Sequence, residues 1–409
     1  MVSIVQSMRT VVEIETQLHG YTPLQFSERT GIHIEQLDNP RSVTVDTLDK
    51  ISSLLGRPRG WLYEVYLREC FTSDILTSSE QFALAESLFE QGKKKEAIPL
   101  YRQVVDNRDG YDPQYIMSQF RLFQSLIGIG VEENREAVFR FETHYKQLPK
   151  DVRLDALLQM ANVYYTFEGW KKVERYADEM RDLASKIYEE QLTNGKPYNY
   201  LRMERHLVVY LGQGYLLKGV ALAKQEQYEE AKEYVLKYSD LGWFHFLDET
   251  GQKEVEKFQA WGKGNMYALE LNTGNETVIT EYLTFIEKHP NEYISGAMHI
   301  AKAACKFNFS VDGILEKLAI KLPSIGSNIT HIQGTQLFYF WFEKSKISFK
   351  RNRRKDGIDE LLYALQFARN IKYYSGFEKS VSLFWKHIDH ATDQQKMDFH
   401  NIFEGEIEL

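Results

Sequence analysis

The feature that most constrains the fold of this chain is a repeating pattern of small and large residues with the spacing of paired helices. It is clearest in residues 212–245, which fit a 34-residue helix–turn–helix unit with small Gly219 and Ala231 where two helices must approach closely. The larger residues that fill the gaps between the two helices are Tyr215, Leu222, Tyr228, Val235 and Tyr238. Such a pair cannot bury its apolar face alone, so the pattern predicts an array of stacked helix pairs.

Looser copies of this pattern recur along the chain. They are carried by Ala85, Leu88, Gly92, Ala97, Tyr101 and Val104, by Tyr164, Trp170, Val173, Ala177 and Met180, by residues 265–290, and by Gly357, Leu361 and Ala364. Together they resemble tetratricopeptide (TPR) repeats, roughly five to seven of them over residues 80–390. We therefore expect an all-α protein in which a right-handed TPR-type superhelix presents a concave groove lined by the first helix of each pair. Only 9 prolines and 25 glycines interrupt the sequence, which suits long helices.

Residues 1–68 predict a separate bundle of short helices. Thr22 and Gln25 form a capping box, Gly31 is a natural helix end, and Thr44 is a good N-cap. The expected helices cover residues 1–20, 23–29, 32–37, 45–55 and 58–70. A helix, a glycine turn and a second short helix in this order are typical of a helix-turn-helix domain.

The bundle resembles the helix-turn-helix of phage repressors (the XRE/Cro type) through residues 26–31 and 47–56. Between Gly31 and Arg41, where the recognition helix should lie, the chain is about four residues shorter than the usual pattern. Two interpretations follow: a shortened helix that still enters the major groove, or a bundle that has lost DNA reading and serves as a structural or protein-docking domain. Residues 1–70 hold seven basic and nine acidic side chains, a net charge of −2, which does not decide between them.

The DNA-binding interpretation predicts two kinds of contact. The residues expected to reach base edges are His33, Glu35 and Gln36, and those expected to hold phosphates are Gln25, Arg41 and Arg59.

The order of a repressor-like domain, a linker over residues 69–79, TPR-like repeats and a terminal segment over residues 391–409 resembles the RRNPP receptors (the Rap, Rgg, NprR, PlcR and PrgX types) and the arbitrium receptors of phages. The resemblance implies a quorum-sensing transcription regulator that binds a short linear signalling peptide in the groove and a DNA operator through its first domain. It also implies a homodimer whose conformation and DNA affinity the peptide alters, and the terminal segment is expected to cap the array or to pair two copies. The alternatives are a Rap-like adaptor that docks a signalling protein and a general TPR scaffold.

A peptide groove needs amides for the peptide backbone and charged or aromatic side chains for its sequence. The residues expected on the groove are Asn162, Tyr165, Arg202, Arg205, His206, Gln213, Asn265, Tyr267, Lys302, Gln333, Gln336 and Tyr339. Arg202 and Arg205 are the best candidates to bind a carboxylate, because the guanidinium fork matches its geometry.

No catalytic, nucleotide-binding or metal-binding motif is present, so we expect neither an enzyme nor a cofactor nor a metal site. The two cysteines, the absence of a signal-peptide pattern and the lack of a long apolar run predict a cytoplasmic protein without membrane contact. The basic run at residues 350–355 is expected in a turn of the last repeat, either solvated or contacting an anion, DNA or a partner.

Overall fold

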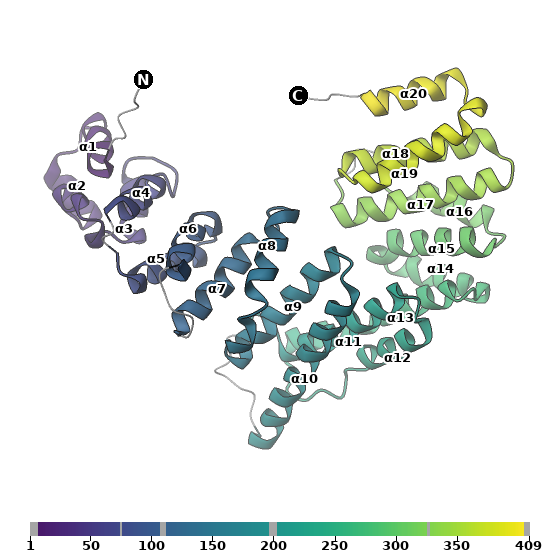
Figure 1. Ribbon diagram of the computed structural model, residues 1–409, viewed down its shortest axis with the longest axis horizontal. Helices are drawn as coiled ribbons and strands as arrows, with labels where there is room; N and C mark the ends of the chain where they lie inside the picture. Colours follow the sequence, from purple (N-terminus) through teal and green to yellow (C-terminus); the bar gives the residue numbers. More distant parts are fainter. Residues whose placement is uncertain (1–6, 74–75, 107–111, 196–202, 325–327, 405–409) are drawn as a thin grey trace. The chain divides into compact units, whose positions relative to one another are not determined.

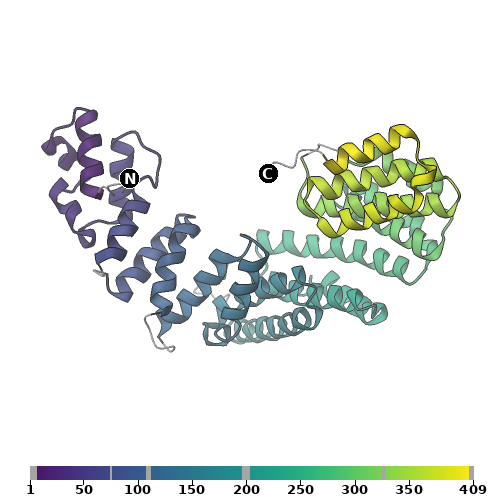
Figure 2. The ribbon, with the colours of Figure 1, turned by 45° about the horizontal axis from the view of Figure 1, so that its top comes forward.

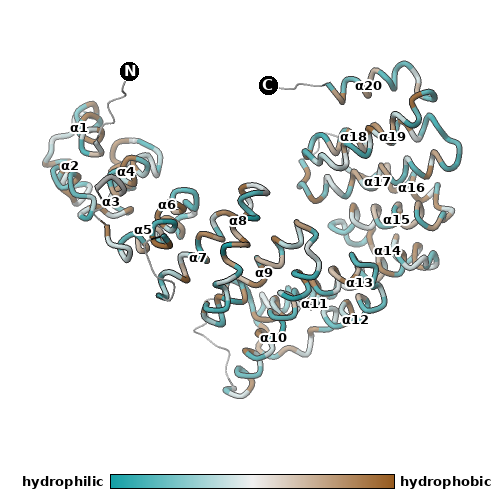
Figure 3. Tube along the Cα trace, in the orientation of Figure 1, coloured by the Kyte–Doolittle hydropathy of each residue, from teal (hydrophilic) through white to brown (hydrophobic). Residues whose placement is uncertain are grey.

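The computed structural model describes residues 7–73, 76–106, 112–195, 203–324 and 328–404. Within these residues every regular element is a helix, so the all-α class predicted from the sequence is confirmed (Figures 1 and 2). Hydrophobic and hydrophilic residues alternate along the helices (Figure 3), as expected where each helix buries one side. The chain divides into two compact units, one of residues 1–169 and 200–204 and the other of residues 170–199 and 205–409.

The first unit begins with a bundle of short helices. They are α1 (Met8–Leu18), α2 (Pro23–Thr30), the 3-10 helices η1 (Ile34–Asp38) and η2 (Pro40–Ser42), α3 (Val45–Leu54) and α4 (Tyr63–Ser73). The predicted capping box is confirmed, because Thr22 Oγ1 accepts the Gln25 N–H at 3.3 Å and Gln25 Oε1 accepts the Thr22 N–H at 3.0 Å. Gly31 ends α2 in the left-handed region at φ 76°, and Phe26 and Leu48 are fully buried in the core of the bundle.

Three of the helices expected in this bundle differ in the structure. The helix expected over residues 1–20 is α1, which begins at Met8 after its N-cap Ser7, and residues 1–6 of that prediction lie outside the described residues. The α-helix expected over residues 32–37 is instead the five-residue 3-10 helix η1, which ends at Asn39 because Pro40 follows and has no N–H to continue it. The helix expected from residue 58 onward begins only at Tyr63, after a turn in which Gly60 has a φ of 88°. The helices expected over residues 32–37 and 58–70 thus both begin later than predicted, at Ile34 and Tyr63.

The rest of the first unit consists of longer helices. They are α5 (Ser78–Glu90), α6 (Lys94–Asp106), α7 (Pro113–Leu126), α8 (Val131–Phe141), the 3-10 helix η3 (Tyr145–Gln147) and α9 (Lys150–Thr166). Each of α5, α6 and α7 packs against the next helix in the chain. Phe120, Phe123 and Phe141 stack between α7 and α8, with ring centroids 5.0 Å apart for Phe123 and Phe141.

The second unit repeats the arrangement with helices that pack against their neighbours in the chain. They are α10 (Trp170–Asn194), α11 (Leu207–Lys224), α12 (Tyr228–Ser239), α13 (Glu249–Asn272), η4 (Glu276–Val278), α14 (Ile279–Lys288), η5 (Pro290–Glu292), α15 (Tyr293–Phe307), α16 (Asp312–Lys321), α17 (His331–Lys350), α18 (Arg354–Asn370), α19 (Tyr374–His387), η6 (Ile388–His390) and α20 (Asp393–Glu404). In the clearest predicted repeat, a Cβ at Gly219 would lie 3.2 Å from the Tyr234 side chain of α12. The small residue therefore allows the close approach of α11 and α12.

The terminal helix α20 packs against α18 and α19 in the second unit. The Phe384 and Phe399 rings stack with centroids 3.9 Å apart, and Gln395 Nε2 donates to the Lys355 carbonyl at 3.0 Å. Residues 393–404 thus cover the end of the helix stack. The predicted domain boundaries stay predictions, and the division between the two compact units lies within the predicted array.

Candidate functional site

The residues expected to line a peptide groove fall in both units. Asn162 and Tyr165 are exposed on α9 of the first unit. Arg202 lies outside the described residues. The others belong to the second unit, at the start of α11 or on α11, α13, α15 and α17. In the groove prediction these four helices are the first members of successive pairs.

His206 has a structural role that the sequence pattern did not predict. It is the N-cap of α11, where its Nδ1 accepts the Val208 N–H at 3.2 Å. Its Nε2 lies 3.3 Å from the Phe246 carbonyl oxygen and donates to it. Both ring nitrogens therefore have partners within the unit. The neighbouring Arg205 is exposed, and its backbone N–H donates to the Tyr210 hydroxyl at 3.2 Å.

Three more of the expected groove residues have hydrogen-bond or stacking partners within the second unit. Asn265 Nδ2 donates to the Tyr238 hydroxyl at 2.8 Å and so joins α13 to α12. Gln333 completes the capping box of α17, with its Oε1 accepting the Thr330 N–H at 2.9 Å. Tyr267 stacks on Tyr282 with ring centroids 5.1 Å apart.

Gln213 and Gln336 remain as amides without a hydrogen-bond partner for their side chains among the described residues, and both are half-buried. They lie on α11 and α17. They keep the donors and acceptors that a peptide backbone needs.

Lys302 and Tyr339 form the most specific contact among the expected residues. The Lys302 Nζ on α15 lies 3.7 Å from the centroid of the Tyr339 ring on α17. The Tyr339 hydroxyl is 2.9 Å from the hydroxyl of Tyr373, the N-cap of α19. Within the described part of the chain no carboxylate forms an ion pair with Lys302, and the nearby Glu343 is bonded to Lys346 at 2.7 Å. We call Lys302, Tyr339 and Tyr373 the lysine–tyrosine site.

The surroundings of this site are positively charged. The pKa of Lys302 is lowered to about 8, mainly by burial and also by Lys224, Lys379 and Lys346, while Glu343 opposes the decrease. Burial also lowers the pKa of His299 to about 3, aided by Lys302 and Lys224, so this imidazole is neutral at pH 7. The charged residues come from four helices, α11, α15, α17 and α19.

The sequence pattern missed several members of this cluster. His299 stands three residues before Lys302 on the same helix, a spacing that puts both on one face. Lys224 is the last residue of α11 and Tyr373 precedes α19. The helical spacing of His299 was readable from the sequence, whereas the proximity of Lys224 and Tyr373 depends on how the helices pack.

The six residues expected to contact DNA are all exposed in the first unit. Gln25 and Gln36 use their side-chain oxygens to cap α2 and η1, Gln36 by accepting the His33 N–H at 2.8 Å. Arg59 Nε donates to Asp49 Oδ2 at 2.8 Å, and Arg41 lies 4.0 Å from Glu80. His33 and Glu35 project from the exposed side of η1, whose Ile34 and Leu37 are buried.

Another arginine of this bundle is also paired. Arg57 donates through Nε and Nη2 to both carboxylate oxygens of Glu15, at 3.1 Å and 2.5 Å. Together with the Arg59–Asp49 pair, this contact neutralises guanidinium groups at the end of α3 that a phosphate would otherwise meet.

The basic run near residue 350 also has internal partners. Lys350 Nζ donates to the Cys305 carbonyl at 2.6 Å, Arg351 Nη2 to the Phe309 carbonyl at 2.8 Å, and Arg353 Nη2 to Asp312 Oδ1 at 2.6 Å. These three side chains therefore join the end of α17 and the turn after it to the last turn of α15, to Phe309 and to the start of α16.

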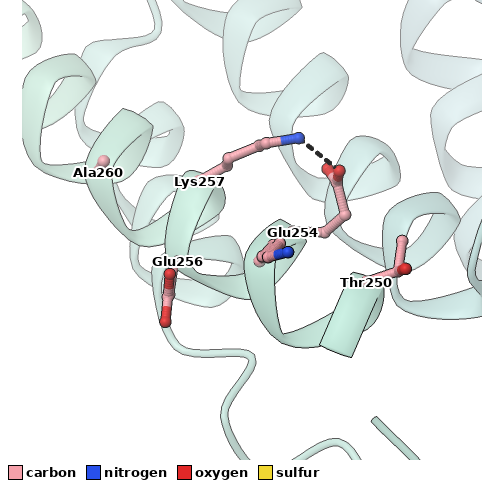
Figure 4. Close-up of a pocket in the computed structure, with 6 residues that line it drawn as sticks. Thr250, Glu254, Glu256, Lys257 and Ala260 are labelled. Atoms are coloured by element: carbon pink, nitrogen blue, oxygen red, sulfur yellow. Dashed lines mark hydrogen bonds and ion pairs between the residues drawn. The ribbon is translucent and has the colours of Figure 1, made fainter. Parts of the chain in front are cut away.

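Two surface hollows offer few polar groups that could select a ligand. One, of about 530 Å³, is lined only by residues of α13, and Lys257 and Glu254 in it pair with each other at 2.5 Å (Figure 4). The other, of about 300 Å³ in the first unit, lies among α5, α7 and α9. There Arg121 Nε donates to Glu86 Oε1 at 3.0 Å, and the Glu204 N–H donates to Asp155 Oδ2 at 3.1 Å. Its polar groups bind one another.

In the described residues no three His, Cys, Asp or Glu side chains gather as a metal site requires. Each helix in the same residues is too short or too polar to cross a bilayer. No protein-family model matches the chain, and no curated protein is significantly similar to it.

Proposed function

We propose that the chain is a receptor for a short linear peptide, and a binding protein rather than an enzyme. In this proposal the helix pairs form a right-handed TPR-type superhelix, and the peptide lies along the first helices of the second unit. The observation that carries the proposal is the half-buried Lys302, held over Tyr339 without an ion-pair partner among the described residues. A protein that only needed a stable helix stack would gain nothing from an uncompensated buried charge.

The groove chemistry supports the same proposal. Gln213 and Gln336 keep hydrogen-bonding groups for a peptide backbone, and the lysine–tyrosine site supplies a cation and aromatic surface. Asn265, Gln333 and His206 also form hydrogen bonds within the chain, Asn265 to Tyr238 and the other two at the starts of α17 and α11.

We further propose that this receptor is a cytoplasmic transcription regulator of the quorum-sensing type. Its N-terminal bundle would act as a helix-turn-helix domain on a DNA operator, and the receptor would work as a homodimer. The capped α2, the left-handed Gly31 and the exposed His33 and Glu35 support this role. To change the ratio of two receptor conformations from 1:99 to 99:1, the peptide must bind the second conformation more tightly than the first by about 5.5 kcal/mol.

A specific observation also favours a second candidate, an adaptor whose bundle docks a signalling protein. Arg57 and Arg59 are both engaged by carboxylates, and η1 is only five residues long. Base reading by a recognition helix needs several residues on one exposed face. A bundle of this kind suits recognition of a protein surface.

Affinity selection from a random hexapeptide library tests the receptor proposal. The purified full chain should retain a related set of sequences, and retention of none would exclude a peptide receptor. A gel-shift assay with DNA from upstream of the chain's own gene separates the two candidates. A regulator shifts this DNA with an affinity that the selected peptide alters, whereas an adaptor leaves it unshifted.

A further inference from the structure

The lysine–tyrosine site has a charge that the described residues leave uncompensated. Lys302 Nζ contacts the Tyr339 ring, and the carboxylate that acts on it, Glu343, is bonded to Lys346 at 2.7 Å. Lys224, Lys346 and Lys379 surround Lys302, so the cluster of four lysines and one glutamate has a net charge of +3.

The contact with Tyr339 positions the ammonium and leaves donors available. A cation over an aromatic face is attracted to the ring without an opposite charge. The ammonium has three N–H donors, and the ring meets only one side of it. The hydroxyls of Tyr339 and Tyr373, 2.9 Å apart, add two uncharged polar groups to this site.

Transferring such a cation from water to a partly buried position costs free energy unless an anion compensates it. An anion that binds beside Lys302 would therefore recover part of the free energy that burial of its ammonium costs. The depressed pKa of Lys302 and the neutral His299 beside it agree with a region short of negative charge.

We propose that the lysine–tyrosine site binds a carboxylate of the peptide, with Lys302 as the residue that selects for it. This inference rests on the proposed peptide-receptor function and names the chemistry of its ligand. A peptide offers a carboxylate from two sources, its C-terminus and an Asp or Glu side chain. The ammonium cluster would accept either, and the experiment separates them.

The experiment uses three synthetic hexapeptide libraries with the purified full chain. The first has a free C-terminal carboxylate and no Asp or Glu, the second has a C-terminal amide and no Asp or Glu, and the third has a C-terminal amide with Asp and Glu allowed. Peptides that remain bound after gel filtration are quantified by mass spectrometry. The first library should be retained at least tenfold above the second if the C-terminus is bound, and the third above the second if a side chain is bound.

Variants assign the selection to Lys302. The Lys302→Met protein should retain peptides with and without a carboxylate about equally. Lys302→Arg should keep most of the preference for a carboxylate because the positive charge remains. Lys253→Met is the matched control, because Lys253 is exposed on α13 and pairs with Glu249 at 2.6 Å. It should leave the preference unchanged. Circular dichroism and thermal unfolding confirm that each variant is folded.

The outcomes separate this inference from the function on which it rests. Equal retention of all three libraries, or a preference that survives Lys302→Met, overturns the carboxylate assignment while the receptor proposal stands. Retention of none of the libraries by the unaltered chain overturns both.

Discussion

The Lys302 ammonium lies 3.7 Å from the centroid of the Tyr339 ring, and among the described residues no ion pair compensates its charge. A structural lysine in a helix stack is usually exposed or paired with a carboxylate. Lys302 is neither. We therefore expect its charge to lower the stability of the unliganded protein and to raise the affinity for an anionic ligand, and both effects can be measured.

Replacing Lys302 with Met should stabilise the unliganded protein at pH 7 by about 1–3 kcal/mol, because it removes a desolvated charge and keeps the apolar stem. The pKa of about 8 in the folded state lies below that of an unfolded lysine, so the folded state loses the proton first. The stability of the unaltered chain should therefore rise between about pH 8 and pH 10, as the penalty disappears.

Urea unfolding of both proteins at pH 7, 8 and 9.5 checks this prediction. The advantage of Lys302→Met should be full below pH 8 and shrink above it. The charges that face Lys302 are Lys224 on α11, Glu343 and Lys346 on α17 and Lys379 on α19, and Lys346→Met serves as a control for the loss of a neighbouring charge. A destabilised Lys302→Met protein would contradict the uncompensated charge.

Lys344 on α17 should respond to the same substitution in the opposite way to Lys302. Lys344 is 4 % exposed and pairs with Glu360, which is 6 % exposed, and with Glu316 at 2.8 Å. Lys344→Met should destabilise the protein by about 3–5 kcal/mol, because it leaves a buried carboxylate without its partner. Adding Glu360→Leu should recover most of this loss. Chemical unfolding measures both changes.

The matched control for this pair is Lys321→Met. Lys321 bonds to Glu287 at 3.0 Å with both side chains more than half exposed, and its loss should not change the unfolding midpoint measurably. Equal effects of Lys344→Met and Lys321→Met would mean that burial of the first pair has no energetic consequence.

The parts of the fold that could be predicted from the sequence are those that depend on neighbouring residues. The box between Thr22 and Gln25 and the turn at Gly31 follow from local backbone chemistry, and the structure has both. The end of η1 before Pro40 was also predictable from local chemistry, but its start at Ile34 and its 3-10 form were not. The first residues of the helices after Gly31 and after Pro58 were thus the weakest local predictions.

The candidate site was less predictable because its partners are distant in sequence. Asn265 and His206 have polar side chains on suitable helices, yet they bond to Tyr238 and Phe246, and no periodicity reports these contacts. Lys302 and Tyr339 were identified from their positions on first helices. That the ammonium lies on the ring depends on how α15 packs against α17.

Gly212, in the clearest repeat, should tolerate no side chain. A Cβ there would lie 2.5 Å from the ring of Phe258 on α13, which is fully buried and has no space to move. Gly212→Ala should destabilise the protein by about 1–3 kcal/mol in chemical unfolding. Gly242→Ala is the control, because nothing lies within 4 Å of a Cβ at that position. Equal stability of the two variants would show that α11 and α13 pack less closely than in the structure.

The last prediction concerns the N-terminal bundle and DNA. Asp49 Oδ2 holds Arg59 Nε at 2.8 Å, so Asp49→Asn should release a guanidinium for a phosphate while keeping an acceptor for the Tyr63 hydroxyl. If the bundle binds DNA through this side, affinity should rise, and the slope of log K against log salt should steepen by about 0.9 for one added phosphate contact.

Fluorescence anisotropy with DNA from upstream of the chain's own gene, at several salt concentrations, measures that slope. Glu28→Gln removes the same charge from an exposed position of α2 that pairs with no arginine among the described residues, so it should leave the slope unchanged. Equal slopes for Asp49→Asn and the unaltered chain would exclude Arg59 as a phosphate contact. If neither protein binds the DNA at low salt, the adaptor is the better account of the bundle, because the electrostatic attraction that every DNA-binding domain uses is then missing.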